Sequence, residues 1–139
     1  MGYGLERFEA AQEGTFEAAL AELRRGRKQS HWMWWVFPQI AGLGRSPTAR
    51  RYAIRHRAEA EAYLAHPVLG PRLVEAAEAM LSNEGRAADG VLGPVDAMKL
   101  RSSMTLFDAL PGTRPVFGQV LSAFHDGTRC EHTLARIRP

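Results

Sequence analysis

Hydrophobic residues recur at helical spacing along most of the chain, and turn residues separate the apolar segments. Residues 5–12 read as a short helix, and residues 16–25 as a second one with Thr15 as N-cap and Gly26 as its left-handed end. Further helices are expected over 48–64 (one bent helix or two short ones), 71–81, 95–110 and 115–125. A short apolar turn is expected at 87–92, and one more turn in the tail 131–137. The pattern predicts a mainly α protein, with residues 1–139 forming a single compact domain of about six to eight short helices and little or no sheet.

Residues 29–46, which we call the tryptophan segment, do not fit this pattern as clearly. They contain all three tryptophans of the chain, Trp32, Trp34 and Trp35. The local composition favours a strand, but no other convincing strand is available to pair with it. Since an unpaired buried strand leaves backbone groups unsatisfied, we expect a turn or two of helix, capped by Ser30 and stopped by Pro38. Three tryptophans so close together indicate a segment that lines either the core or a ligand-binding site.

Charge is distributed unevenly, although the net charge is only +3. Between residues 23 and 58 there is no Asp or Glu, while nine of the 18 basic residues lie there. The rest of the chain carries nine basic and 15 acidic residues. Such segregation creates a local positive potential around the tryptophan segment, which points to an anionic partner. A solvated basic face without a ligand is the alternative.

Several classes of protein are disfavoured by the composition. The longest apolar run, residues 32–37, is far too short to span a membrane, and the N-terminus lacks the pattern of a signal peptide. A single cysteine, Cys130, allows neither an internal disulfide nor a thiolate zinc site. The histidines do not have metal-binding spacing, and Gly42-x-Gly44 lacks the rest of a dinucleotide fingerprint. We therefore expect a cytoplasmic protein with no metal and no cofactor.

The predicted helix over 95–110 has polar residues on its apolar side. At 100° per residue, Asp96, Lys99 and Ser103 share a sector with Leu and Phe, while Ser102 falls in the adjacent sector with Val95 and Met98. Ala97, Arg101 and Asp108 are expected to face water. Burying an unpaired Lys or Asp is costly, so each should have a partner. The two can pair with each other at i, i+3, or they can belong to a binding site.

Parts of the sequence resemble the domain-of-unknown-function family 1810. The resemblance rests on four runs: 30–39 (SHWMWWVFPQ), 42–46 (GLGRS), 63–73 (YLAHPVLGPRL) and 96–107 (DAMKLRSSMTLF). It implies a small, mostly α-helical bacterial domain and brings no established reaction, and the calpastatin label of some members has no physical basis in this sequence. Residues 52–58 depart from the family pattern, because His56 stands where a capping Ser is expected. A weaker analogy links the chain to helical domains that handle NAD- and ADP-ribose-linked compounds.

Two functions from different classes follow. The first is a pocket for a small anionic ligand, nucleotide- or ADP-ribose-like, in which His31 acts as acid or base and Lys99 stabilises negative charge. The remaining residues of that predicted site are Trp32, Trp34, Trp35, Gln39, Gly44, Arg45, Ser46, Asp96, Ser102 and Ser103. The second is a module that binds nucleic acid or an acidic protein through the basic region 24–57. Convergence of His31, Gln39, Lys99 and Ser103 on one cavity would favour the pocket.

Overall fold

All regular secondary structure in the computed structural model, which describes residues 2–138, is α-helical. The helices are α1 (Glu6–Gln12), α2 (Phe16–Arg25), α3 (Met33–Val36), α4 (Pro47–Arg51), α5 (Arg57–Ala65), α6 (Leu69–Leu81), α7 (Ala88–Leu92), α8 (Pro94–Asp108), α9 (Pro115–His125) and α10 (Glu131–Arg136). The predicted fold class is confirmed. The ten helices of residues 2–138 outnumber the six to eight expected because α3, α4, α7 and α10 have only four to six residues each. Met1 and Pro139, the ends of the predicted domain, lie outside the described part.

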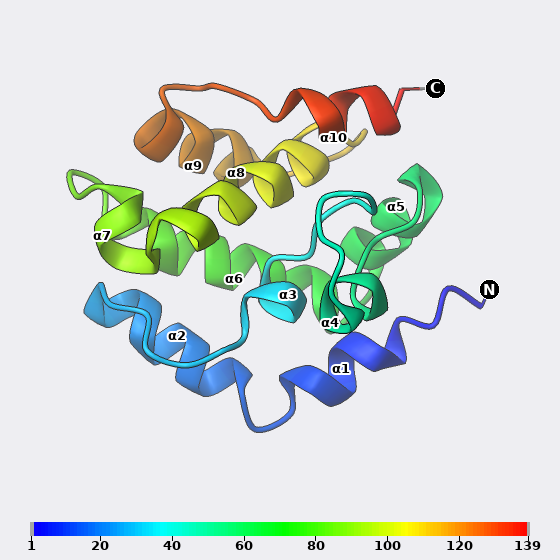
Figure 1. Ribbon diagram of the computed structural model, residues 1–139, viewed down its shortest axis with the longest axis horizontal. Coiled ribbons are helices and arrows are strands. Elements are labelled where there is room, and N and C mark those ends of the chain that lie inside the picture. Colours follow the sequence, from blue (N-terminus) through cyan, green and yellow to red (C-terminus); the bar gives the residue numbers. More distant parts are fainter. Residues whose placement is uncertain (1, 139) are drawn as a thin grey trace.

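Helix α8 runs through the middle of the molecule, with α7, α9, α10 and α5 packed around it. Helix α6 lies beside it and contacts α2, α5 and α9. Figure 1 shows α1, α2 and α3 on one side of α6 and α8, and α9 and α10 on the other. This arrangement places the tryptophan segment against the start of α8.

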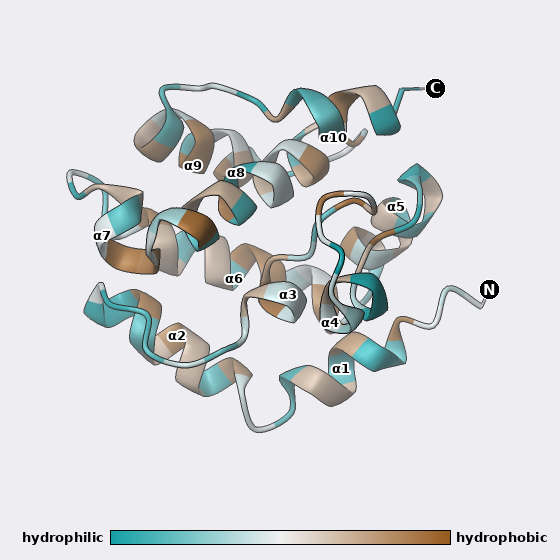
Figure 2. Ribbon diagram, viewed as in Figure 1, coloured by the Kyte–Doolittle hydropathy of each residue, from teal (hydrophilic) through white to brown (hydrophobic). Residues whose placement is uncertain are grey.

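The central position of α8 explains why its predicted water-facing sector is wrong. Ala97 is buried, whereas Val95 and Met98 are 66% and 62% exposed. From Ser102 to Phe107 every residue is buried, because helices cover α8 on several sides there. A helix buried all round has no single apolar face that residue periodicity can find. Outer helices keep the expected pattern, and Figure 2 shows polar and apolar residues alternating along α1 and α2.

The predicted end of α2 is confirmed, and α4 and α5 begin with side-chain caps. Gly26 ends α2 in the left-handed region, with φ 81°. At the start of α4 the Ser46 hydroxyl accepts a hydrogen bond from the Ala49 amide at 3.0 Å. His56 caps α5, because its Nδ1 accepts from the Glu59 amide at 3.2 Å. Histidine thus takes over the capping role of the serine that the family resemblance leads one to expect.

Thr15 stands at the N-cap position of α2 as predicted, whereas Ser30 does not occupy that position in α3, and neither hydroxyl group caps its helix. The Thr15 hydroxyl donates to the carbonyl of Ala11 at 2.6 Å and accepts from the Trp35 indole at 3.1 Å, instead of capping α2. The Ser30 hydroxyl donates to the Glu22 carboxylate, and α3 begins without a side-chain cap. Both hydroxyls hold the tryptophan segment to α2 and to the turn before it.

The predicted helical region 48–64 is divided into α4 and α5 by a short extended stretch. Within it, Ile54 forms an isolated parallel bridge with Ile40. The Ala41 amide donates to the Ile54 carbonyl and the Ile54 amide to the Gln39 carbonyl, both at 2.8 Å. This pairing fixes the backbone on both sides of Ile40. None of the helices in residues 2–138 has the length and apolar character that crossing a membrane requires.

Candidate functional site

A cleft of about 340 Å³ lies between the tryptophan segment, the start of α4 and the start of α8. The short helix α3 presents its tryptophans to the cleft, and the first turns of α8 present their polar side chains from the opposite wall. Of the predicted site residues, the cleft brings together His31, Trp32, Trp34, Trp35, Ser46, Asp96 and Lys99. These residues come from parts of the chain that are far apart in sequence.

Both lysines of the chain meet one carboxylate in this cleft. The chain has 18 basic residues, and only Lys28 and Lys99 are lysines. Lys28 Nζ lies 3.0 Å from Asp96 Oδ2, and Lys99 Nζ lies 3.0 Å from Asp96 Oδ1. All three side chains are largely buried, with exposed fractions of 10%, 20% and 17% for Lys28, Lys99 and Asp96. The expected Asp96–Lys99 pair is present, and Lys28 gives it one net positive charge.

Each ammonium group also faces an indole ring. Lys99 Nζ lies 4.1 Å from the centroid of the Trp34 ring, and Lys28 Nζ lies 5.1 Å from that of Trp32. The negative face of an aromatic ring attracts a cation at such distances, and more strongly where water is excluded. Trp32 is 1% exposed and belongs to the core, whereas Trp34 and Trp35 are partly exposed. Trp34 is therefore a partly exposed indole that also faces an ammonium group.

Sequence reasoning missed Glu22, which holds the start of the tryptophan segment. Its carboxylate accepts from the amides of Gln29 and Ser30, the Ser30 hydroxyl and the Trp32 indole. Burial alone would raise the pKa of Glu22, but these hydrogen bonds together lower it from the ordinary 4.5 to about 2. The available signal was its place beside Leu23, three residues after Ala19, at the edge of the apolar face of α2.

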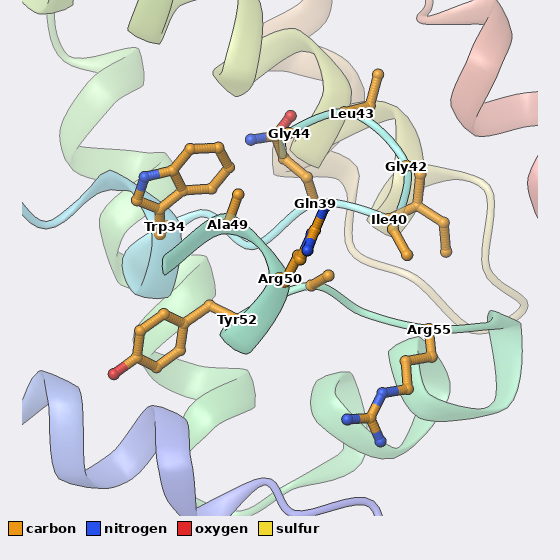
Figure 3. Close-up of a pocket in the computed structure, with 12 residues that line it drawn as sticks. Trp34, Gln39, Ile40, Gly42, Leu43, Gly44, Ala49, Arg50, Tyr52 and Arg55 are labelled. Atoms are coloured by element: carbon orange, nitrogen blue, oxygen red, sulfur yellow. The ribbon is translucent and has the colours of Figure 1, made fainter. Parts of the chain in front are cut away.

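A second, smaller cavity of about 140 Å³ is also lined by Trp34, which thus borders both spaces. Its walls are the 39–44 loop and residues 49–55, and they include the predicted site residues Gln39 and Gly44. Figure 3 shows the Gln39 side chain extending beside Gly44 toward the Trp34 ring, while Tyr52 and Arg55 point away. Gly44 allows the loop itself to lie close against Trp34 and Ala49, because a Cβ there would lie 2.9 Å from Trp34 Cη2 and 2.6 Å from Ala49 Cβ.

Three predicted site residues lie elsewhere. Ser102 donates to the Met98 carbonyl at 3.2 Å and lies 3.5 Å from Cys130 Sγ, so it packs between α8 and the start of α10. Ser103 is fully buried and lines neither space, and Arg45 is exposed and also lines neither. The neighbouring helices cover α8 from Ser102 onward, which removes both serines from the cleft. The expected convergence is thus partial, with His31 and Lys99 in the cleft, Gln39 in the adjoining cavity and Ser103 in the core.

The acid-free basic region is partly neutralised by carboxylates that lie outside it in the sequence. Arg24 pairs with Glu75 at 3.3 Å, and Arg57 pairs with Glu61 at 3.2 Å, in addition to the Lys28–Asp96 contact. Arg50 and Arg55 are exposed and line the smaller cavity. Folding therefore divides one basic stretch of sequence into paired side chains and a smaller group near the cavity.

Comparisons with known proteins agree on the fold and carry no activity. A family model described as "Protein of unknown function (DUF1810)" matches residues 2–137. The chain is similar to the conserved hypothetical protein Rv1873 from Mycobacterium tuberculosis, whose crystal structure superposes with a TM-score of 0.95 at 42% sequence identity. That match covers 99% of this chain and 98% of the other. No match is found among curated proteins.

Proposed function

We propose that this chain, which belongs to the family of proteins of unknown function DUF1810, binds a small anionic molecule of the nucleotide or ADP-ribose class in the cleft beside Trp34. The observation that carries the proposal is the meeting of both lysines of the chain on Asp96, under an accessible indole. The other 16 basic residues are arginines. The lysine side chains of the chain are thus confined to this cleft.

The charge balance supports an anionic ligand. Taking three charged groups largely out of water costs free energy, which ion pairing and the contacts with indole faces offset. One positive charge remains without a carboxylate, since Asp96 is the only acidic residue among the described residues lining the cleft. A phosphate oxygen that approaches Lys28 and Lys99 would complete this balance and form charge-assisted hydrogen bonds. Asp96 meanwhile holds both ammonium groups in position.

The size and walls of the cleft support the nucleotide class. Ligand pockets commonly range from about 300 to 1,000 Å³, so a cleft of about 340 Å³ suits a small molecule better than a macromolecule. The partly exposed rings of Trp34 and Trp35 offer flat apolar surface for a base or a sugar. A simple inorganic anion would use the lysines and leave these rings without a partner.

Isothermal titration calorimetry with ADP, ADP-ribose and ribose 5-phosphate tests the proposal. The native protein should bind at least one of them, and Lys99→Ala should weaken that binding by about tenfold or more, as expected for the loss of one charge-assisted contact. Arg24→Ala is the matched control, because it removes a positive charge from an exposed pair outside the cleft. Equal affinity in Lys99→Ala and Arg24→Ala would overturn the proposal.

The proposal concerns binding, and catalysis by His31 and Lys99 stays a prediction. His31 is exposed at the cleft, and its ring has no hydrogen-bond partner within residues 2–138. A general acid or base normally needs its ring oriented by a neighbouring group or by the substrate. Comparing the chemical fate of each bound nucleotide with native protein and with His31→Ala distinguishes turnover from binding alone.

A surface for nucleic acid or an acidic protein is the second candidate. It is supported by Arg50 and Arg55, which are exposed and have no acidic partner within the described residues. This function would give steeply salt-dependent binding that the triple substitution of Arg50, Arg51 and Arg55 by Ala abolishes. Lys99→Ala would leave such binding unchanged, which separates it from the cleft proposal.

A further inference from the structure

The side chain of Gln39 is buried beside the smaller cavity with part of its amide unpaired. Gln39 is 6% exposed, and its Nε2 has no hydrogen-bond partner within residues 2–138. Leaving a buried amide nitrogen unpaired is destabilising, so such groups are uncommon in native proteins. The backbone of Gln39 is fixed by the bridge with Ile54, whose amide donates to the Gln39 carbonyl at 2.8 Å. The amide therefore stands on a rigid base at the cavity.

The dimensions of the cavity suit one ring. Its volume of about 140 Å³ is close to that of the engineered apolar cavity of about 150 Å³ that accepts benzene. Ile40, Ala49 and Trp34 provide apolar surface for the faces of a planar group, and Gln39 provides a polar edge. A purine with its sugar would exceed this space, whereas a six-membered heterocycle fits it.

Trp34 lines both the smaller cavity and the cleft. Lys99 contacts this ring from the side of the cleft, and Gln39 extends toward it in the other space. Figure 3 shows the Gln39 side chain beside the Trp34 ring. A molecule with an anionic part in the cleft and a ring in the smaller cavity would contact Trp34 in both.

We propose that the smaller cavity is a second compartment of the same site, which takes a single six-membered heterocycle with an amide edge, such as a pyrimidine or nicotinamide ring. Gln39 is the residue that binds that edge. A side-chain amide carries a donor and an acceptor side by side, and a lactam or carboxamide edge is complementary to both. This complementarity holds whichever way the Gln39 amide is turned. The inference rests on the proposed function, because it specifies which anionic ligands the cleft selects.

Gln39→Met tests this assignment, because methionine keeps the length of the side chain and removes its amide. If Gln39 served only to pack the core, its replacement would change stability without selectively changing ligand binding. Because the unpaired amide nitrogen is unfavourable in the free protein, the Tm of Gln39→Met equals or exceeds that of the native protein. The same variant no longer binds rings with an amide edge more tightly than apolar rings.

The binding experiment uses three probes on the full chain: uracil, toluene as an apolar ring, and pyrophosphate. Native protein should bind uracil at least tenfold more tightly than toluene, and Gln39→Met should abolish that difference while leaving pyrophosphate binding unchanged. Lys99→Ala should do the reverse, weakening pyrophosphate and not uracil. Comparing the affinity for UMP with the affinities for uracil and for pyrophosphate shows whether one molecule fills both compartments.

The outcomes separate the two proposals. If neither pyrophosphate nor any nucleotide binds while uracil still binds through Gln39, the proposed function is overturned. The assignment of the smaller cavity as a ring compartment then still holds. Pyrophosphate binding through Lys99 without any difference between uracil and toluene overturns the ring compartment alone. A Gln39→Met variant that loses Tm and binds uracil as the native protein does would assign Gln39 a packing role and overturn the inference.

Discussion

The ammonium group of Lys99 lies 4.1 Å from the centroid of the Trp34 ring, so a charge on α8 is held over an aromatic ring on α3. The same ammonium group pairs with Asp96 at 3.0 Å. Any molecule that withdraws Lys99 toward an anion changes the electrostatic surroundings of the indole. Trp34 therefore serves as a built-in reporter for the cleft, and this contact links the helix to the tryptophan segment.

Glu22 should make the stability of the protein depend on pH in the acidic range. Its pKa of about 2 in the folded chain lies below the ordinary 4.5, which corresponds to about 3 kcal/mol of stability for this buried group. That contribution is complete above about pH 4.5 and is lost as the pH falls toward 2. Urea denaturation at pH 7, 4.5, 3 and 2 measures it.

Glu22→Gln provides the matching variant. It should be about 2 to 3 kcal/mol less stable at neutral pH, because an amide cannot accept hydrogen bonds from all four donors around Glu22. The difference between the variant and the native protein should shrink below pH 4.5. An unchanged difference at pH 2 would contradict the role assigned to this carboxylate.

The buried pair of Arg7 and Glu59 should be far more sensitive to substitution than an exposed pair. Arg7 Nη2 lies 2.7 Å from Glu59 Oε2, and the Glu59 side chain is 1% exposed. Arg7→Met leaves that carboxylate uncompensated and should cost about 3 to 5 kcal/mol. Arg24→Met, at an exposed pair with Glu75, should cost less than about 1 kcal/mol. Chemical denaturation of both variants checks the contrast, and equal losses would refute it.

Gly44 should be required for space and not for backbone conformation. An alanine Cβ there would meet Ala49 and Trp34 at distances under 3.0 Å, so Gly44→Ala should cost about 1 to 3 kcal/mol and shift the Trp34 emission. Gly90→Ala is the control, because nothing lies within 4 Å of a Cβ at that helical position. The control should be neutral or stabilising by up to about 1 kcal/mol. Thermal denaturation and fluorescence of the two variants measure both effects.

The sequence predicts the helical class well, because most helix ends depend on local chemistry. Ser46, followed by Pro47, begins α4, and Gly26, which follows two arginines, ends α2. Both signals lie in immediately neighbouring residues. Thr15 and Ser30 were assigned as caps by the same rule, but partners distant in sequence, Trp35 and Glu22, bind their hydroxyls. Local signals cannot reveal such competition.

The candidate site was also predictable only in part, because some of its contacts are local in sequence and others are not. Asp96 and Lys99 were conspicuous because charged residues on a helix beside buried positions need partners, and the predicted pair is present. Lys28 joining them could not be foreseen, since it depends on how the turn after α2 meets α8. Ser102 and Ser103 lay on the expected side of the helix, but neighbouring helices bury that half of α8. Periodicity identifies a face of a helix and not what covers it.

Amine labelling tests most directly whether an anion occupies the cleft. The two lysine side chains of the chain both lie there, so acetylation followed by mass spectrometry reports on the site residue by residue. We expect a nucleotide at saturating concentration to protect Lys28 and Lys99 at least severalfold, while labelling of the N-terminal amine stays unchanged. Equal labelling of Lys28 and Lys99 with and without every nucleotide and sugar phosphate would contradict the account.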